Sequence, residues 1–337
     1  MKTERRAMPK PSLLTQKRQA AIPCSQGYGT RRAFTLIELL VVFIIISILS
    51  SLMLAGLAGA RQRAKTDKTK STIRKIDSVI RPMFDSYRTR RVALTSPSLT
   101  NRKSNALSLL IAKRSLMVRE MPDSWDDVPD VPADPQAFNN LADSGGTDLR
   151  TAPVRAYTIT RIANSSNPNY SLSLLKNYGS SECLFMIVTR SGFEPDALEM
   201  FRTDEVGDID KDGANEFLDG WGRPIAFLRW APGMTGSLVQ NGNPDLAHDP
   251  MDPLRQDSTA FALVPLIFSA GPDESTNAPD DSAADGYGLA RVASWSAQDL
   301  SKICDVINAD NQKPGVPKVG NTSAYQDNIT NHDLLKK

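Results

Sequence analysis

The sequence predicts an α+β protein in which a long N-terminal transmembrane helix packs on a C-terminal antiparallel-sheet globular domain with long loops. Three observations predict this fold class. Residues 34–59 are apolar, an apolar stripe continues through 73–87, and short apolar runs between Pro-, Gly- and Asp-rich stretches fill the remainder. We expect four parts: a leader over 1–33, the spanning helix over 34–59, its extension over 60–92 and a globular domain over 93–337.

The membrane segment reads FTLIELLVVFIIISILSSLMLAGLAG, residues 34–59, which exceeds the roughly 20 apolar residues that a spanning helix needs. Glu38 is its only charged residue, and Arg31 and Arg32 stand directly before it. Because basic residues stay on the cytoplasmic side of a membrane, we expect the leader in the cytoplasm and the C-terminal part across the bilayer. A secretory signal fits less well, because its cleavage site would follow the apolar stretch.

The helix is expected to continue beyond the membrane. Apolar residues recur there at spacings of three and four: Ile73, Ile76, Ile80, Phe84 and Tyr87. We expect this stripe to pack on the globular body rather than to form a separate coiled coil. Pro82 should kink or locally disturb the helix.

The body is expected to contain a second helix over 102–120, stopped by Pro122. Ser180 or Ser181 is a candidate cap for a short helix through 183–188, although that run also suits a buried strand.

Two strands are expected, over 224–230 and 261–268. Pro265 places the second at a sheet edge or a bulge. The polar stretch 232–258 is expected to be an excursion between them.

The charge balance excludes some functions. Residues 91–337 carry 22 basic and 33 acidic side chains, and an acidic body argues against a nucleic-acid surface. The chain has two histidines, His248 and His332, and no nucleophile elbow or P-loop, so we expect no enzyme.

Cys183 and Cys304 would remain in the body, and the sequence leaves open whether they pair.

A calcium loop is the best candidate site. Asp208, Asp210 and Asp212 occupy alternate positions before Gly213, so three carboxylates turn toward one point and the glycine permits a sharp bend. The further candidate ligands are Glu216 and Asp219. Because no helix pair flanks the loop, the pattern indicates an isolated calcium loop rather than an EF-hand. The alternative is a solvated acidic turn.

The N-terminal motif carries a specific resemblance. Arg31-Arg32-Ala33-Phe34-Thr35-Leu36-Ile37-Glu38 resembles the start of type IV pilins and type II secretion pseudopilins. The resemblance implies a pilin-like fold, cleavage between Ala33 and Phe34 by a prepilin peptidase, and methylation of the new amine of Phe34. That family usually has Gly where this chain has Ala33. The resemblance also implies that Glu38 faces the N-terminal amine of a neighbouring subunit, whereas the alternative is that Glu38 reaches water at the membrane edge.

The same resemblance implies a function and partners. The chain would be a structural pseudopilin in the inner membrane, with its body in the periplasm or outside. Its partners would be copies of itself, other pseudopilins, an inner-membrane secretion platform and the lipid bilayer, in a filament that drives protein export. Alternatives are a type IV pilin or competence pseudopilin, a monomeric membrane-anchored calcium-binding or recognition module, and a plain signal-anchor protein.

The body adds a second resemblance, to major pseudopilins. Asp219–Pro224, Ser269–Asp273 and Asp327–Asn331 are similar to segments that in those proteins form a turn, open a calcium-binding loop and close the domain. The resemblance implies Asp273 and Asp327 as ligands of a second calcium ion, although the spacing between the segments is longer than in that family.

Overall fold

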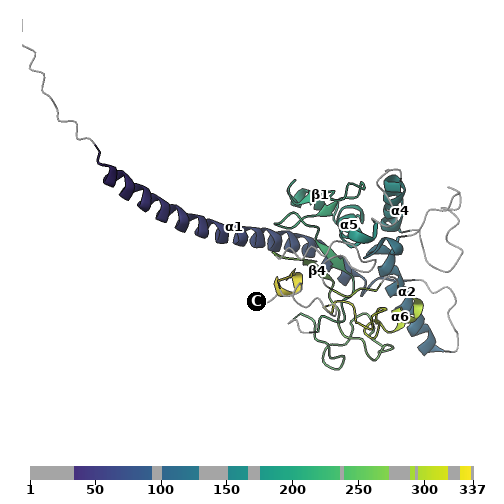
Figure 1. The fold of residues 1–337 in the computed structure, drawn as a ribbon. Helices are drawn as coiled ribbons and strands as arrows, with labels where there is room; N and C mark the ends of the chain where they lie inside the picture. The colour runs from purple at the N-terminus through teal and green to yellow at the C-terminus, as the bar shows by residue number, and fades with distance from the viewer. Residues whose placement is uncertain are drawn as a thin grey trace, which may run out of the picture. The chain divides into compact units, whose positions relative to one another are not determined.

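Helix α1, Leu36–Ser86, is the longest element in the computed structural model of the chain (Figure 1). The structure describes residues 34–92, 101–128, 151–165, 175–235, 239–272, 289–292, 295–317 and 327–334. The chain forms two units, Met1–Ala55 and Gly56–Lys337. Pro82 lies inside α1, and the helix ends at Ser86, so the last residues of the extension expected over 60–92 lie beyond its end.

The apolar stripe of α1 is confirmed as a core face of the second unit. Ile73, Ile76 and Ile80 are fully buried, and Phe84 and Tyr87 follow at 5% and 1% exposure. Burial of each side chain of this size contributes about 1.5–3 kcal/mol, so the stripe makes a large contribution to holding α1 on the body.

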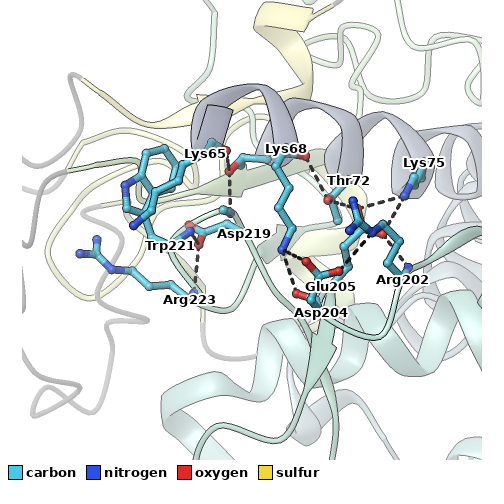
Figure 2. A network of polar contacts seen from close by, with 12 residues as sticks. Lys65, Lys68, Thr72, Lys75, Arg202, Asp204, Glu205, Asp219, Trp221 and Arg223 are labelled. Carbon is cyan, nitrogen blue, oxygen red and sulfur yellow. Dashed lines mark hydrogen bonds and ion pairs between the residues drawn. The ribbon is translucent and has the colours of Figure 1, made fainter. Parts of the chain in front are cut away.

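Polar contacts join α1 to Asp204 and Glu205, which directly precede strand β1, Val206–Gly207 (Figure 2). Lys68 pairs with Asp204 at 2.9 Å. Glu205 accepts from the Thr72 hydroxyl at 2.7 Å and from the Lys75 ammonium at 2.7 Å. These basic residues of α1 thus bond to the body.

The carboxylate of Glu205 gives this interface a pH dependence. Burial alone would raise its pKa, but hydrogen bonds from the Arg202 N–H, Lys75 and Thr72 outweigh burial and lower the pKa. Because the pKa is lower in the folded state, the carboxylate stabilises the fold above its ordinary pKa of about 4.3, and this contribution is lost as pH falls through the folded value.

We expect Glu205→Gln to lower the free energy of unfolding by about 1.5–3 kcal/mol at pH 7, as for a lost charged hydrogen-bond acceptor, and by much less at acid pH. Chemical unfolding of the full chain in detergent at both pH values measures this. The exposed Glu199→Gln should change neither value. An equal loss for Glu205→Gln at both pH values would contradict the assignment.

The other helices are α2 (Arg102–Glu120), α4 (Ala152–Ser165), α5 (Leu175–Arg190), α6 (Ala297–Ser301), α7 (Asn331–Leu334) and the short 3-10 turns η1 (Trp125–Asp127) and η2 (Ala197–Met200). The helix expected over 102–120 is confirmed with the same bounds. Asn101 caps it by accepting from the Ser104 N–H at 3.0 Å. Helices α2 and α6 lie side by side (Figure 1).

Helix α5 corrects the expected cap at Ser180 or Ser181. The helix begins at Leu175, so both serines lie in its interior. The Ser180 hydroxyl instead donates to the Phe227 carbonyl at 2.6 Å and accepts from the Phe227 N–H at 2.8 Å. A tertiary contact, rather than an N-cap, therefore explains this serine.

The described strands form two antiparallel sheets: β1 (Val206–Gly207) with β2 (Glu216–Phe217), and β3 (Ala226–Leu228), β4 (Leu266–Ser269) and β5 (Ile329–Thr330) in that order. In the second sheet Phe227 pairs with Ile267, and Phe268 with Thr330. Helix α5 packs on β2 and β3. The α+β class with a leading helix is confirmed.

The edge position expected for 261–268 is wrong, because β4 is the middle strand. The strand begins one residue after Pro265, so the missing N–H falls outside the pairing. The Pro265 carbonyl accepts from the Asn331 amide at 2.9 Å, and the same amide donates to Asp77 of α1 at 2.8 Å. Strand β5 thus brings the C-terminal segment to both the sheet and α1.

A buried arginine joins three parts of the body. The Arg114 guanidinium, on α2, donates to Asp249 at 2.9 Å, to Asp257 at 3.0 Å and to the Leu300 carbonyl at 2.8 Å. Its side chain is 1% exposed. A buried charge requires such partners, because an unpaired one would lower the free energy of unfolding by about 3–5 kcal/mol.

Both described cysteines are free and buried. Burial raises the pKa of the Cys304 thiol to about 12 and raises the pKa of Cys183 well above its ordinary value. The structure therefore holds Cys183 and Cys304 as two separate thiols.

Candidate functional site

The start of α1 is built by its own side chains. The Glu38 carboxylate accepts from the N–H and from the hydroxyl of Thr35, each at 2.9 Å, while the Thr35 hydroxyl accepts from the Glu38 N–H at 3.3 Å. This reciprocal pair is a capping box, which satisfies N–H groups that have no partner within the helix. Phe34, the residue directly before Thr35, is 78% exposed.

The described apolar side chains of the first unit are exposed from Phe34 to Leu54. Two of its serine hydroxyls bond within the helix, because Ser47 donates to the Phe43 carbonyl at 2.7 Å and Ser51 to the Ile48 carbonyl at 2.8 Å. Among the described residues α1 is the one helix long and apolar enough to cross a membrane, with a mean hydropathy of 2.7 over 18 residues. Such a surface suits lipid or other apolar helices.

The loop between β1 and β2 gathers the predicted acids. Val206 pairs with Phe217, which brings the two ends of the loop together. Lys211 and Gly213 both adopt positive φ angles, 63° and 99°, and these bend the chain back on itself. A β-hairpin therefore carries this loop, in agreement with the expectation that no helix pair flanks it.

Five carboxylates form what we call the acidic cluster: Glu182, Asp208, Asp210, Asp212 and Glu216. Their oxygens fall into two groups, Glu182 with Asp210 and Glu216, and Asp208 with Asp210 and Asp212, and within each group they lie within 4.8 Å of one another. Asp210 belongs to both groups. Four of these residues were candidates from the sequence.

One oxygen of each loop acid accepts a backbone N–H. Asp208 accepts from Gly213 at 3.1 Å, Asp212 from Ala214 at 2.7 Å, and Asp210 from Asp212 at 3.3 Å. Glu216 likewise accepts from the Ile209 N–H at 3.1 Å. The loop backbone thus fixes the orientation of every carboxylate in it.

The second oxygen of each acid has no such partner. One buried oxygen in every member of the acidic cluster lacks a hydrogen bond. Asp212 and Glu216 are 0% exposed and Glu182 is 1% exposed, so these side chains are shielded from bulk solvent. Burial and the neighbouring negative charges raise the pKa of Glu216 to about 8 and that of Asp210 to about 6.

Glu182 is the member that sequence reasoning missed. It lies on α5, and its other oxygen accepts from the Trp125 indole N–H. Burial, followed by the charge of Asp212, raises its pKa well above the ordinary value. The sequence signal for this role was its position directly before the apolar run 183–188. An acid that is buried with such a run requires a polar or charged partner.

Asp219, the fifth candidate ligand, lies outside the acidic cluster. One of its oxygens accepts from the N–H groups of Trp221 at 2.7 Å and Arg223 at 3.0 Å, and the other accepts from the Ser269 hydroxyl at 2.7 Å. Asp219 therefore organises the turn that follows β2, and calcium binding by Asp219 stays a prediction. Trp221 and Gly222 belong to this packed turn.

The segments expected to form a second calcium loop are neighbours where they are described. Ser269 bonds to Asp219, and Arg223 donates to the Gly271 carbonyl at 3.3 Å. A Cβ atom at Gly271 would lie 2.2 Å from the Asp327 carbonyl oxygen. Asp273 lies outside the described residues, so calcium binding by Asp273 and Asp327 stays a prediction.

A cavity of about 210 Å³ adjoins the acidic cluster. Its lining includes Glu182, Gly213 and Asn215, together with side chains of α4 and α5. Glu182 is thus the member of the acidic cluster that lines this cavity.

Comparison with known proteins identifies the N-terminal part. Residues 29–54 match the family model of the prokaryotic N-terminal methylation motif. No curated protein and no solved structure matches the chain. The chain therefore carries the type IV pilin and pseudopilin signature, which confirms the resemblance expected from Arg31–Glu38. That class is structural rather than enzymatic, and its signature implies processing by a prepilin peptidase, assembly with pilin-like subunits and anchoring by one membrane helix.

Proposed function

We propose that this chain is a structural pseudopilin of a type II secretion-like system, anchored in the inner membrane with its body in the periplasm. Its 34–59 helix assembles with copies of itself and other pseudopilins into a filament that drives protein export from an inner-membrane platform. One observation carries this proposal: the methylation motif at 29–54 stands at the head of a helix whose apolar side chains are exposed.

The exposed apolar surface of this helix is the physical reason for proposing membrane anchoring and assembly. Exposed Leu, Ile, Val and Phe side chains over several helical turns are stable only in lipid or against other apolar helices. In the membrane they anchor the subunit, and in a filament the same side chains pack against neighbouring subunits. Glu38 is the one charge among them, and we propose that it receives the amine of Phe34 from a neighbour once the leader is removed.

Processing is tested by the N-terminus and intact mass of the protein purified from its native membrane. We expect a chain that starts at Phe34 and carries one added methyl group. Ala33→Leu should leave residues 1–33 in place, because a small residue precedes the cut. A wild-type chain that retains the leader, or one cut after the apolar stretch, would overturn the assignment.

Assembly is tested by a single cysteine in the membrane helix. Cys24 leaves with the leader, and Cys183 and Cys304 are 0% and 1% exposed, so Leu49→Cys introduces one reactive thiol. We expect membrane-permeant oxidants to give dimers through this thiol, and bifunctional maleimides combined with a second cysteine at Leu40 to give longer ladders. Monomers alone would support the second candidate, an anchored cation-binding or recognition module, which the acidic cluster favours.

The system is distinguished by deleting the gene. Accumulation of secreted proteins in the periplasm is expected for a secretion pseudopilin. Loss of surface fibres or of DNA uptake instead would identify a type IV pilin or a competence pseudopilin.

A further inference from the structure

We propose that the acidic cluster binds one divalent cation of calcium's size, with Glu182 of α5 among its ligands, and that the ion fastens the β1–β2 loop to α5. This site is separate from the membrane helix and stands whether or not the chain forms filaments. It also differs from the loop of Asp273 and Asp327.

The unpartnered oxygens are the first argument. Five carboxylates each use one oxygen for an N–H group and hold the other buried without a donor. A buried acceptor without a partner costs about 1–3 kcal/mol, and more if it is charged, so a cation shared by the carboxylates of a group would stabilise the fold. A solvated acidic turn would not bury Asp212, Glu216 and Glu182 to 0%, 0% and 1% exposure.

The spacing is the second argument. Oxygens that lie within 4.8 Å of one another reach a single ion between them. Calcium binds oxygen at roughly 2.3–2.6 Å, so ligands on opposite sides of the ion are roughly 4.6–5.2 Å apart. Magnesium retains several waters and is usually held by only one or two carboxylates, which suits a cluster of five carboxylates less well.

The donor chemistry is the third argument. The acidic cluster offers only carboxylate oxygens, which are hard ligands that calcium prefers over softer metals. Thiol and imidazole ligands, which zinc favours, do not belong to it. The cavity lined by Glu182, Gly213 and Asn215 provides the approach for the ion.

Because Glu182 lies on α5, an ion bound to it would connect the loop to that helix. This helix is buried and packs on β2 and β3, and the Trp125 indole N–H holds the second oxygen of Glu182. An ion shared by Glu182, Asp210 and Glu216 therefore connects the hairpin loop to the core. Without the ion this connection is missing, and the loop is expected to be held less firmly to α5.

The test compares the full chain in detergent after removal of metals with EGTA and after addition of calcium. When free calcium exceeds the Kd about 100-fold, we expect the Tm to rise by about 5–10 °C. Terbium should bind at the same site and emit on excitation of tryptophan, since Trp125 touches a ligand, and excess calcium should displace it. An unchanged Tm together with no displaceable terbium emission would overturn the site. An equal Tm rise with magnesium would overturn the assignment to calcium's size.

The variants assign the ligands. We expect Glu182→Gln and the half-buried Asp210→Asn each to weaken calcium binding at least about tenfold. Asp210→Asn keeps the test decisive if Glu182→Gln does not fold. The exposed Asp245→Asn should bind calcium as the wild type does. Asp219→Asn is expected to lower the Tm but to keep the calcium-dependent rise, and loss of that rise would return Asp219 to the ligand set in place of Glu182.

Discussion

Replacement of Arg114 by methionine should lower the free energy of unfolding by about 3–5 kcal/mol, because it leaves two buried carboxylates without their cation. Asp249 is 6% exposed and Asp257 is 1% exposed, so neither gains much from water. The Leu300 carbonyl loses its donor as well, and α2 is then no longer bonded through this side chain to α6. Chemical unfolding of the full chain in detergent measures the loss.

A matched control lies on the same helix. Arg102 is exposed, and Arg102→Met should change the free energy of unfolding by no more than about 0.5 kcal/mol. Combining Arg114→Met with Asp249→Asn and Asp257→Asn should recover part of the loss, because the uncompensated charges disappear. A loss below about 1 kcal/mol for Arg114→Met alone would show that the carboxylates find other partners.

Gly220→Ala should separate α1 from the turn after β2. A Cβ atom at this position would lie 2.2 Å from the Lys65 carbonyl oxygen and 2.7 Å from the Lys65 Cα, so backbone must move. The Gly220 N–H also donates to the Thr69 hydroxyl at 2.8 Å, a contact that the displacement would break. We expect the free energy of unfolding to fall by about 3 kcal/mol, the upper end for overpacking. Trp221 fluorescence should change, because its indole contacts Gln62 of α1 at 3.3 Å.

Gly222→Ala separates steric overlap from backbone strain. Gly222 has a φ of 81°, and nothing lies within 4 Å of a Cβ atom there, so the substitution introduces strain alone. Its expected cost is about 1 kcal/mol. If Gly220→Ala were no more destabilising than Gly222→Ala, the close approach of the turn to α1 would not matter for stability.

Local periodicity in the sequence was enough to predict those features of the fold that depend on a single helix. The spacing of Ile73, Ile76 and Ile80 predicted the buried face of α1, and Pro122 together with the preceding pattern predicted both ends of α2. These features depend on residues within a few turns of one another, so the sequence pattern contains them.

Features that depend on distant partners could not be predicted in the same way. Ser180 has the chemistry of a cap, but its hydroxyl bonds to Phe227 of β3. Pro265 favours an edge strand by itself, yet the pairing of β4 begins after it and β5 arrives from the C-terminus. Glu182 joins the acidic cluster only because α5 packs on β2. In each case the decisive contact crosses a large sequence separation.

The two buried thiols bear on how this protein matures. A thiol whose pKa is raised by burial remains protonated and attacks disulfides slowly, because the thiolate is the reactive form. The folded body therefore needs no oxidative step and no disulfide isomerase to reach its final state. Its integrity is expected to be the same in reducing and oxidising surroundings, so the redox state of the compartment in which the body folds should not alter its covalent structure.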